Sequence, residues 1–576
     1  MAANDVYIGI DLGTTYCCIA FCSKNGAPDV LTDERNNRVI PSCITYSNGQ
    51  WMAGRKAVEE SKKMSATSLR LLKRTTGRTS FDGKLRGDLE KLGFTNPTFA
   101  PVSADPTAWQ ADGDIDDELP MRPLFKIGEG YTVAEEFAAR LLKHLVQIAE
   151  KRLGEPISGA VITVPADYVG SQRESVMTSA KIAGLKVLRL INEPTAAIVG
   201  ARAAGTIDDG KVLVFDIGGG TTDISLVVVQ GNTYCVKGTK GHQWLGGEDI
   251  NGILIQLICK TLRAEPKKGR NDKRFREACE MIKRNLGDDP TLNLDSQFLQ
   301  LYFPDSPAAE VDEVEILREE FDEACQDFYQ NVYDLADRLL KDTETYPHEL
   351  TTILMVGGSA GLVGLQCYLE KQLPNTCVLV PPGYEEVVAK GAALVAASET
   401  DPGKRIVLTE VLAHSIGIQI NDGSMVSILH AGDELPGKSI SGCDTFANGV
   451  DYQEEMRIAI YEGEGKVAAE NTYLGAFIMS ISPMPAGKLE VEVTVTANME
   501  GLVHVTAKEC KDGAEPHSIN ISREGSWSEE TIFNLRLKVD GGMGAAPKMS
   551  TGTKRKLAEQ SDLNDGEGDR SAKVIV

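Results

Sequence analysis

Two segments of the chain, separated by about 200 residues, share one pattern: an apolar run, a tight polar turn and a second apolar run. The first spans residues 6–21, with the turn Asp-Leu-Gly-Thr-Thr at 11–15. The second spans residues 212–229, with the turn Asp-Ile-Gly-Gly-Gly-Thr-Thr-Asp at 216–223. Short apolar runs on both sides of a glycine-containing turn predict a strand, a turn and a strand. Two such turns, facing each other, would enclose one ligand from both sides.

Each turn combines a carboxylate, glycine and threonine hydroxyls, which together suit a nucleoside triphosphate. Glycine lets backbone N–H groups approach an anion closely, and hydroxyls add further donors. The aspartate beside them can hold a hydrated Mg²⁺ ion. Neither a Walker loop nor a G-x-G-x-x-G segment after a strand occurs in the chain, so the predicted phosphate site is of another type. The alternative, that both are ordinary hairpins, does not account for their matching chemistry.

Four more segments accompany the two turns: INEPTAA at 191–197, LGGED at 245–249, VGGS at 356–359 and KGAA at 390–393. In this order and spacing they resemble the actin-like ATPase superfamily and, within it, the seventy-kilodalton heat-shock chaperones of the DnaK type. The resemblance covers roughly residues 5–539. It implies an α/β actin-like ATPase domain followed by an antiparallel β-sandwich peptide-binding domain, with little C-terminal helix.

Composition agrees with a chain of two or three domains, because 576 residues exceed what one core usually supports. The net charge of −23 argues against nucleic acid or an anionic membrane as a partner. No apolar run is long enough to span a membrane, and no secretion signal is found, so we expect a cytoplasmic protein. A basic triplet at 554–556 leaves the nucleus open. The twelve cysteines lack C-x-x-C spacing and are expected to be reduced.

Pattern changes along the chain predict its domain boundaries. Strand-like runs alternate with amphipathic helices, such as 135–152, in a nucleotide-binding ATPase domain, and residues 95–120 are expected to form a surface insertion. From about 411 a period of two dominates, as expected for a β-sandwich. The predicted parts are the ATPase domain at 1–402, a linker at 403–411, a substrate-binding sandwich at 412–525, a truncated lid helix at 526–540 and a disordered polar tail at 541–576.

The resemblance also implies site residues, each at a position that matches a family motif. Lys73 would position the attacking water, Glu193 would orient it, and Asp223 would accept its proton beside Thr221. Asp11 and Asp216 would hold Mg²⁺ through water. The residues that would bind ATP or ADP are Gly13, Thr14, Thr15, Tyr16, Gly218, Gly219, Gly220, Glu280, Lys283, Arg284, Gly357, Gly358, Ser359 and Glu385. Taken alone, a lysine or a glutamate would more often be solvated surface.

Two departures concern the adenine base. Gly361 stands where the family usually has an arginine that packs on adenine, and Gly287 replaces a serine that hydrogen-bonds the base. We therefore expect ATP affinity about tenfold weaker than is usual in the family. Cys17 and Cys279 would lie near the nucleotide, where oxidation control is conceivable and inert core thiols are the favoured alternative.

Communication between the domains would use four positions of the family pattern: Pro165, Arg173, Leu408 and Glu410. The linker departs from that pattern at Thr409, where a leucine is usual. Arg189, Asn192 and Glu410 match positions that contact J-domain co-chaperones in the family. Nucleotide exchange factors and unfolded or extended polypeptide clients are the other partners that the resemblance implies.

The client cleft departs more from the family. Its apolar positions match Ile418, Ile420, Phe446, Met456, Ile458 and Ile481, which would also serve as sandwich core. The two residues that arch over a bound client would be Asn421 and Gly449, and such a polar, open arch predicts weak and fast-exchanging peptide binding.

Three functions follow for comparison. The first is an ATP-hydrolysing chaperone that binds extended apolar segments and responds to J-domain partners. The second is a regulatory family member that binds ATP and partners another chaperone without handling clients. The third, a sugar kinase of the same superfamily, conflicts with the predicted sandwich.

Overall fold

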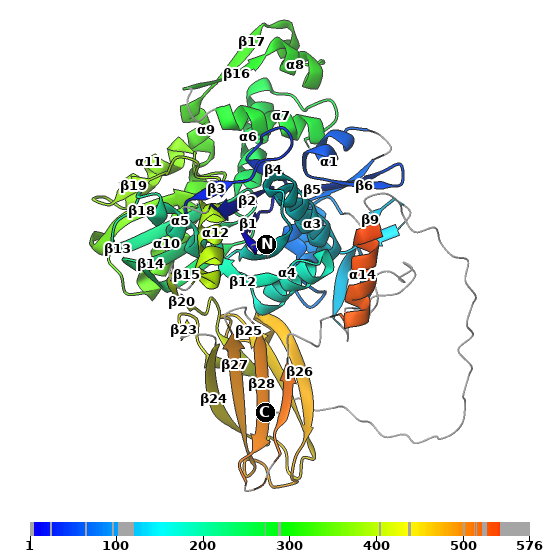
Figure 1. Cartoon of the computed structure of the whole chain (residues 1–576), viewed down its shortest axis with the longest axis vertical. Helices are drawn as coiled ribbons and strands as arrows, with labels where there is room; N and C mark the ends of the chain where they lie inside the picture. Colours follow the sequence, from blue (N-terminus) through cyan, green and yellow to red (C-terminus); the bar gives the residue numbers. More distant parts are fainter. Residues whose placement is uncertain are drawn as a thin grey trace, which may run out of the picture.

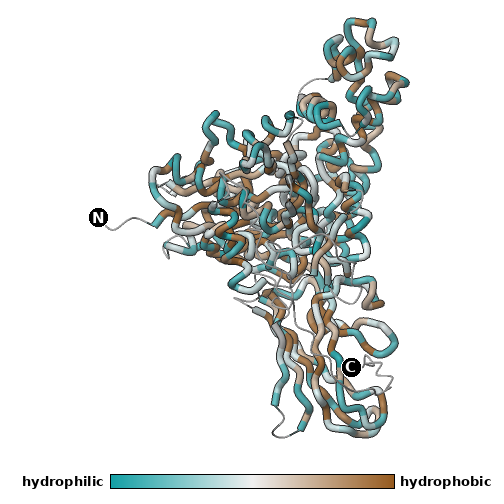
Figure 2. The backbone as a smooth tube through the Cα atoms, turned by 90° about the vertical axis from the view of Figure 1, so that its right-hand side faces the viewer, coloured by the Kyte–Doolittle hydropathy of each residue, from teal (hydrophilic) through white to brown (hydrophobic). Residues whose placement is uncertain are grey.

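The computed structural model describes residues 5–541 apart from 24–25, 64–65, 95–96, 102–119, 129, 271, 286–289, 402–404, 436–438, 499–501, 512, 514 and 521–526. A broad α/β part, residues 5–401, stands above a narrower part made of strands, here called the sandwich, residues 412–520 (Figure 1). In the side view of Figure 2 the sandwich projects away from the α/β part.

Two large sheets organise the α/β part. The first has the strand order β12-β11-β1-β2-β3, with β4 paired to β2, and the second has the order β19-β18-β13-β14-β15-β20-β23. The strands of the first sheet are β1 (Val6–Leu12), β2 (Tyr16–Cys22), β3 (Pro28–Val30), β4 (Val39–Pro41), β11 (Ile157–Val164) and β12 (Val187–Asn192). Those of the second are β13 (Gly210–Ile217), β14 (Thr222–Gln230), β15 (Thr233–His242), β18 (Leu350–Val356), β19 (Cys377–Leu379), β20 (Val407–Val411) and β23 (Glu434–Leu435).

The repeated sequence pattern forms a repeated piece of structure. Strands β1 and β2 pair antiparallel, as do β13 and β14, so both predicted hairpins are confirmed. The first strand of each hairpin also has a parallel neighbour, β11 for β1 and β18 for β13. The two sheets therefore present their polar turns in equivalent positions.

Two helices, α5 (Glu193–Ala203) and α12 (Val387–Thr400), cross between the sheets. They approach so closely that a Cβ atom on Gly391 would overlap the carbonyl oxygen of Ala196. On its other side α12 lies against β1, where a Cβ atom on Gly9 would overlap the backbone at Ala393. The KGAA segment thus supplies small residues where the backbones of α5, α12 and β1 meet.

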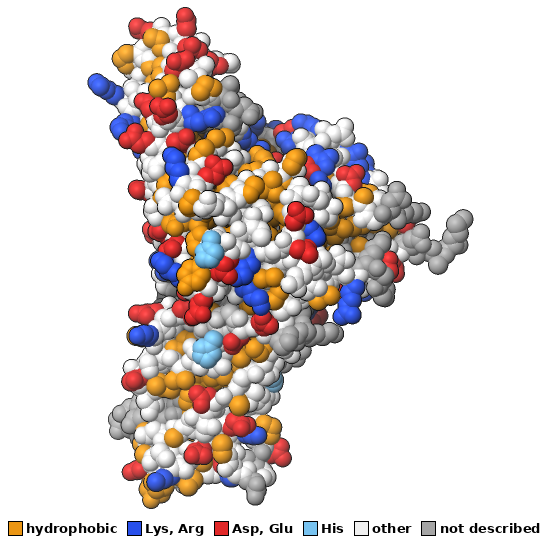
Figure 3. Space-filling model, turned by 90° about the vertical axis from the view of Figure 1, so that its left-hand side faces the viewer, with side chains coloured by type: hydrophobic (Ala, Val, Ile, Leu, Met, Phe, Trp, Pro, Cys, Tyr) orange, Lys and Arg blue, Asp and Glu red, His pale blue; other side chains and the backbone are white. Residues whose placement is uncertain are grey.

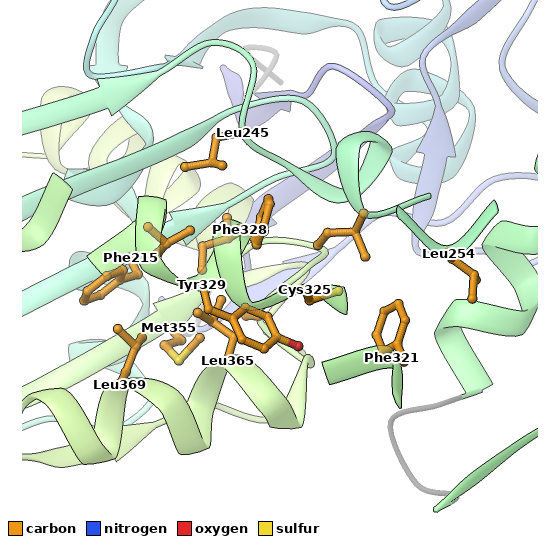
Figure 4. Packing of buried hydrophobic residues seen from close by; sticks show 14 of the residues in the cluster. Phe215, Leu245, Leu254, Phe321, Cys325, Phe328, Tyr329, Met355, Leu365 and Leu369 are labelled. Atoms are coloured by element: carbon orange, nitrogen blue, oxygen red, sulfur yellow. The ribbon is translucent and has the colours of Figure 1, made fainter. Parts of the chain in front are cut away.

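A large apolar core covers the outer face of the second sheet (Figure 4). Phe215 of β13 packs there with Phe328 and Tyr329 of α10 (Gln326–Asp342), and the ring of Tyr329 is fully buried. Helix α6 (Gly247–Leu262) adds Leu254, and α11 (Val363–Gln372) adds further leucines. This core fixes α6, which begins directly at the second polar turn.

The remaining elements of the α/β part form smaller units. The helices are α1 (Gly54–Glu60), α2 (Leu85–Lys91), α3 (Ala134–Leu153), α4 (Gly170–Ala183), α7 (Lys273–Asn285), α8 (Ser296–Tyr302) and α9 (Arg318–Ala324). The strands are β5 (Cys43–Ser47), β6 (Gln50–Ala53), β7 (Thr67–Arg70), β8 (Thr98–Pro101), β9 (Met121–Ile127), β10 (Gly130–Thr132), β16 (Thr291–Asp295) and β17 (Glu313–Leu317). None of the helices in the described ranges is both long and apolar enough to cross a membrane.

Of two sequence predictions for the α/β part, one is confirmed and one is wrong in part. The helix expected at 135–152 is α3, and its apolar positions Phe137, Leu141 and Leu145 are buried as predicted. The surface insertion expected at 95–120 is wrong at its start, because β8 lies within that range, pairs with β9 and buries Phe99. Its Pro101 misled the prediction, since an edge strand such as β8 tolerates proline at its end. Residues 102–119 lie outside the described residues.

The sandwich consists of two four-stranded antiparallel sheets around one apolar core. The first sheet contains β22 (Met425–Leu429), β21 (Ile416–Gln419), β25 (Glu455–Glu462) and β26 (Thr472–Ser480). The second contains β24 (Ser439–Ala447), β27 (Glu490–Asn498), β28 (Val503–Glu509) and β29 (His517–Asn520). Alternation along β27 buries Val491, Val493 and Val495, as its period of two predicts.

Two segments attach the sandwich to the α/β part. Before it, β20 pairs in parallel with β15, with Leu408 opposite Tyr234, so most of the predicted linker is a strand of the second sheet. After it, α14 (Glu529–Gly541) packs against α3 and α4 (Figure 1). The Oγ of Ser528 accepts a hydrogen bond from the N–H of Thr531 at 3.1 Å, which is the N-cap expected there. Of the predicted tail, residues 542–576 lie outside the described residues.

Charge is mixed on the surface shown in Figure 3: acidic and basic side chains are interspersed on both the α/β part and the sandwich.

The glycine at the helix crossing gives a first test. Replacing Gly391 by alanine should destabilise the protein by about 1–3 kcal/mol, because the new methyl group has no space against α5. Gly252, in α6 with nothing within 4 Å of an added Cβ atom, is the matched control, and alanine there should stabilise by up to about 1 kcal/mol. Urea unfolding measures both changes, and equal effects of the two variants would contradict the close crossing.

Candidate functional site

The two polar turns lie against each other at the centre of the α/β part. A Cβ atom on Gly219 would overlap the hydroxyl of Thr15, and one on Gly220 would lie 2.7 Å from the Cγ2 atom of Thr14. Gly13 is equally confined, since a Cβ atom there would overlap the backbone of Tyr16. These turns therefore need glycine to approach each other, and their N–H groups and hydroxyls gather in one place.

The second turn is braced by the segments that accompany it in the sequence. The N–H of Gly247, at the start of α6, donates to the carbonyl oxygen of Gly218 at 3.0 Å. Ser359 donates to the same oxygen through its hydroxyl at 3.1 Å. Gly357 has a φ of +86°, and a Cβ atom there would overlap Oδ1 of Asp216. Only glycine satisfies both conditions, which explains the VGGS segment physically.

Lys73 and Glu193 form a buried ion pair beside the turns. The Nζ of Lys73 lies 2.7 Å from Oε1 of Glu193, and both side chains are about nine-tenths buried. Lys73 lies in one helical turn, Leu72–Thr75, whose carbonyl oxygen at Lys73 accepts from the hydroxyl of Tyr168 at 3.0 Å. Glu193 is the first residue of α5, where the positive end of the helix dipole favours a carboxylate.

Three more carboxylates share this buried region with only one lysine. Burial, reinforced by the charge of Glu193, raises the pKa of Asp11 to about 7. The same causes raise the pKa of Asp216 and of Asp223 well above the ordinary range. Thr163 partly compensates by donating to Oδ1 of Asp11 at 3.2 Å.

Such an excess of oxygen ligands fits a hydrated Mg²⁺ ion, which prefers oxygen donors and keeps its own waters. Asp11 and Asp216 are the residues that would hold it. In the ranges that the structure describes, no group of three or more His, Cys, Asp or Glu side chains is arranged to hold a metal ion directly. The predicted contacts pass through water, and they stay a prediction.

Arg74 is a residue of this site that the sequence analysis missed. Its Nη2 donates to the carbonyl oxygen of Gly220 at 2.7 Å and lies 3.3 Å from Oδ2 of Asp249. Its guanidinium also stacks over the ring of Trp244 at 4.1 Å. Arg74 thus ties the second turn to the start of α6, and its place directly after Lys73 was the available signal.

The residues expected around the nucleoside form a second cluster. On α7, the Nζ of Lys283 lies 2.7 Å from Oε2 of Glu280, and the Nε of Arg284 lies 3.0 Å from Oε1 of Glu280. The guanidinium of Arg284 lies 3.5 Å from Glu385 and 4.9 Å from the centre of the Tyr16 ring. The structure therefore brings α7, β2 and the start of α12 together, as one nucleoside site would require.

The space beside Gly361 is occupied by a side chain of this chain. A Cβ atom on Gly361 would lie 2.6 Å from the hydroxyl of Tyr384. A tyrosine thus reaches the position from which, by the resemblance, an arginine would extend. Gly287, the other departure at the adenine base, lies outside the described residues. Gly358, of the predicted base-binding turn, lies beside Glu385.

The two thiols expected near the nucleotide are buried. Burial raises the pKa of Cys17 and of Cys279 to about 12. Since the thiolate is the reactive form, this favours inert core cysteines over oxidation control at these positions.

The residues predicted to couple the two parts form a chain of hydrogen bonds. Arg173 of α4 donates from Nη2 to Oδ1 of Asn192 at 2.6 Å, and Asn192 donates from Nδ2 to Oε2 of Glu410 at 2.9 Å. Asn192 and Glu410 are both buried, so in this conformation the linker covers that part of the predicted J-domain contact. Arg189 pairs with Glu399 at 3.3 Å, and Pro165 lies in the turn that precedes α4.

The residues predicted for the client cleft lie in the core of the sandwich. Ile418, Met456 and Ile458 have no exposed surface, whereas Phe446 and Ile481 keep a small exposed fraction. Ile420 is half-buried, and the predicted arch residues Asn421 and Gly449 are exposed in turns. The structure therefore places five of these residues in the sandwich core and leaves the two predicted arch residues exposed to solvent.

Comparison with known proteins adds to this geometry. The family model described as Hsp70 protein matches residues 7–562. A heat shock 70 kDa protein of Neurospora crassa is 30% identical over 92% of this chain and 79% of its own length. Chaperone protein DnaK of Thermus thermophilus is 32% identical over 92% of this chain and 82% of its own length. A DnaK of Mycoplasmoides gallisepticum is also 32% identical, over 92% and 83%.

Three features of the structure together define the class of protein: paired hairpin turns in an α/β part, a linker that forms a strand, and a β-sandwich. With the family model matched over nearly its whole length, the chain belongs to the Hsp70 family.

Thiol reactivity tests the description of the buried cysteines. At pH 8, iodoacetamide should modify Cys367, Cys377, Cys443 and Cys510, which are exposed. Cys17 and Cys279 should react about 10³-fold more slowly than a free thiol, because a pKa near 12 leaves little thiolate. Mass spectrometry of peptides from the folded protein measures each rate. Fast labelling of Cys17 in folded protein would contradict its burial.

Proposed function

We propose that the chain is an ATP-dependent molecular chaperone, which hydrolyses ATP to ADP and phosphate and binds extended apolar segments of unfolded proteins. The observation that carries this proposal is the buried ion pair of Lys73 and Glu193, placed beside two facing glycine-threonine turns. Burying a lysine and a glutamate away from water is costly, and a purely structural nucleotide binder has no need of that pair.

The residues suggest how hydrolysis would proceed. A water oxygen attacks the γ-phosphorus while the bond to the β–γ bridging oxygen breaks, and the water gives up a proton. Lys73 and Glu193 would position that water, and Thr14, Thr15 and Thr221 would donate to the phosphates. Asp223 would accept the proton, and the burial that raises its pKa makes its carboxylate a stronger base. Mg²⁺, when bound, would neutralise phosphate charge.

Support for coupling comes from the linker. In this structure β20 extends the second sheet, and Glu410 joins the hydrogen bonds of Arg173 and Asn192. A change at the phosphate site would reach the sandwich along these contacts. We further propose J-domain co-chaperones and nucleotide exchange factors as partners, ATP, ADP and Mg²⁺ as ligands, and the cytoplasm as the location.

A specific observation favours the second candidate, a regulatory family member. Ile418, Met456 and Ile458 are wholly occupied in the sandwich core, and the arch positions are Asn421 and Gly449. A protein of this kind would bind ATP and partner another chaperone without handling clients. The two proposals differ in peptide binding, which a direct measurement decides.

Replacing Lys73 by alanine should lower single-turnover ATP hydrolysis by about 10²–10³ while ATP binding is partly retained, because one positioned charge is lost. Lys341→Ala is the control, since that lysine pairs with Asp337 on an exposed face of α10. Rapid-quench assays with labelled ATP give the rate, and calorimetry gives the affinity. A Lys73→Ala variant with the rate of the control would remove Lys73 from the proposed site.

Fluorescence anisotropy with a labelled, extended, apolar peptide separates the two proposals. For a chaperone, affinity should be weak with ADP and weaker still with ATP and Mg²⁺, because the nucleotide state would bias the docked linker. Dissociation should be fast, since the polar arch provides little to retain a peptide. ATP hydrolysis without peptide binding in either state would favour the regulatory member.

A further inference from the structure

We propose that His414 and Asp167 are positioning residues for Asp223, so that the sandwich orients a carboxylate of the hydrolytic site through two consecutive hydrogen-bonded contacts. This inference rests on the proposed ATP hydrolysis. It names a second route between the two parts, which runs beside the contacts of Arg173, Asn192 and Glu410.

The first contact lies inside the α/β part. The main-chain N–H of Asp167, in the turn between β11 and α4, donates to Oδ1 of Asp223 at 3.1 Å. Gly241 of β15 confines both residues, because a Cβ atom there would overlap the side chain of Asp167 and lie 2.9 Å from Oδ1 of Asp223. Because the N–H of Asp167 is bonded directly to Asp223, a shift of the Asp167 backbone would move the carboxylate of Asp223 or break this hydrogen bond.

The second contact crosses to the sandwich. His414 lies three residues after β20, and its Nε2 atom is 3.1 Å from the carbonyl oxygen of Asp167 and 3.2 Å from its Oδ1. One imidazole N–H group thus faces both acceptors of the same residue. Because His414 enters the sandwich directly after the linker strand, undocking of β20 would withdraw the imidazole from Asp167.

A further contact fixes the same turn. Glu462, the last residue of β25, accepts at Oε2 from the N–H of Gly170 at 3.0 Å, at the first residue of α4. A carboxylate is favoured at that helix terminus by the exposed N–H groups and the dipole. The sandwich therefore holds residues 167–170 at two points of opposite charge, with His414 against Asp167 and Glu462 against the helix.

The charged groups around His414 make the contact sensitive to pH. Asp167 faces it from the α/β part and Glu462 from β25, while Arg173 of α4 and His242 of β15 lie near these two acids. Burial alone would lower the pKa of His414, but the hydrogen bond and charge of Asp167, with the charge of Glu462, raise it to about 9.

A histidine whose pKa is higher in the folded state than in the unfolded state stabilises the fold most at low pH. Here that contribution is fully present below about 6.5, the ordinary pKa of histidine, and is lost as the pH rises through about 9. At pH 7 the contact between His414 and Asp167 is therefore intact.

Single-turnover ATP hydrolysis by the full chain tests the proposal. His414→Leu should slow hydrolysis by about fivefold or more at pH 7, with ATP affinity changed less than about twofold. In the unaltered protein the rate should fall as the pH rises through about 9, and this step should be missing in His414→Leu. His414→Gln, which can still donate a hydrogen bond, should recover part of the rate without the pH step.

Two comparisons separate this effect from damage to the fold. His430→Leu is the matched control, because His430 is an exposed histidine of the same sandwich and should leave the rate and its pH profile unchanged. Asp167→Asn and His414→Leu combined should slow hydrolysis no more than either alone, since both break one contact. A His414→Leu protein that behaves like His430→Leu would overturn the proposal, as would fully additive effects.

A measurement without hydrolysis tests the contact between His414 and Asp167 apart from the proposed activity. In protein with labelled histidine, NMR titration should give His414 a pKa near 9, and Asp167→Asn should move it toward about 6.5. If the unaltered chain does not hydrolyse ATP but this shift occurs, the proposed function fails while the contact stands. If the pKa of His414 does not respond to Asp167→Asn, the inference fails whatever the hydrolysis rate.

Discussion

The close crossing of α5 and α12 is the constraint on which the rest of the α/β part depends. Gly391 lets the two backbones meet at Ala196, and this contact sets the separation of the two sheets. Because the first sheet carries Thr14 and Thr15, and the second carries Gly219 and Gly220, that separation also decides whether the turns meet. A bulkier crossing would move the turns apart and separate the groups that are proposed to bind phosphate.

Charge balance decides what such an arrangement can bind. Four buried carboxylates and one lysine form an assembly that is short of positive charge, as the raised pKa values of Asp11 and Asp223 show. The glycine turns and α5 hold these groups in place despite the electrostatic cost. Under the proposed function, a cation bound together with phosphate would supply the missing positive charge.

Much of this was predictable where the signal is local. The two hairpins, helix α3 and the alternation along β27 follow from short periodic patterns, and family motifs pointed to Lys73 and Glu193. The start of the insertion expected at 95–120 was wrong because Pro101 resembles a loop residue although β8 ends there. The docking of α14 on α3 and α4 was not predictable, because buried Leu535 meets partners about 400 residues away. Arg74 was missed for a similar reason, since its partners come from other segments.

The position of α14 has a consequence for how the sandwich can move. β20 precedes the sandwich along the chain and α14 follows it, and both bind the α/β part. The sandwich is therefore attached at two points, like a bivalent ligand. When one of these two segments detaches, the other keeps it close to its binding surface on the α/β part. The effective concentration is then high, so the detached segment rebinds quickly. Complete release needs both attachments open at once, together with the contacts of His414 and Glu462, and an agent that competes for either attachment alone would gain little.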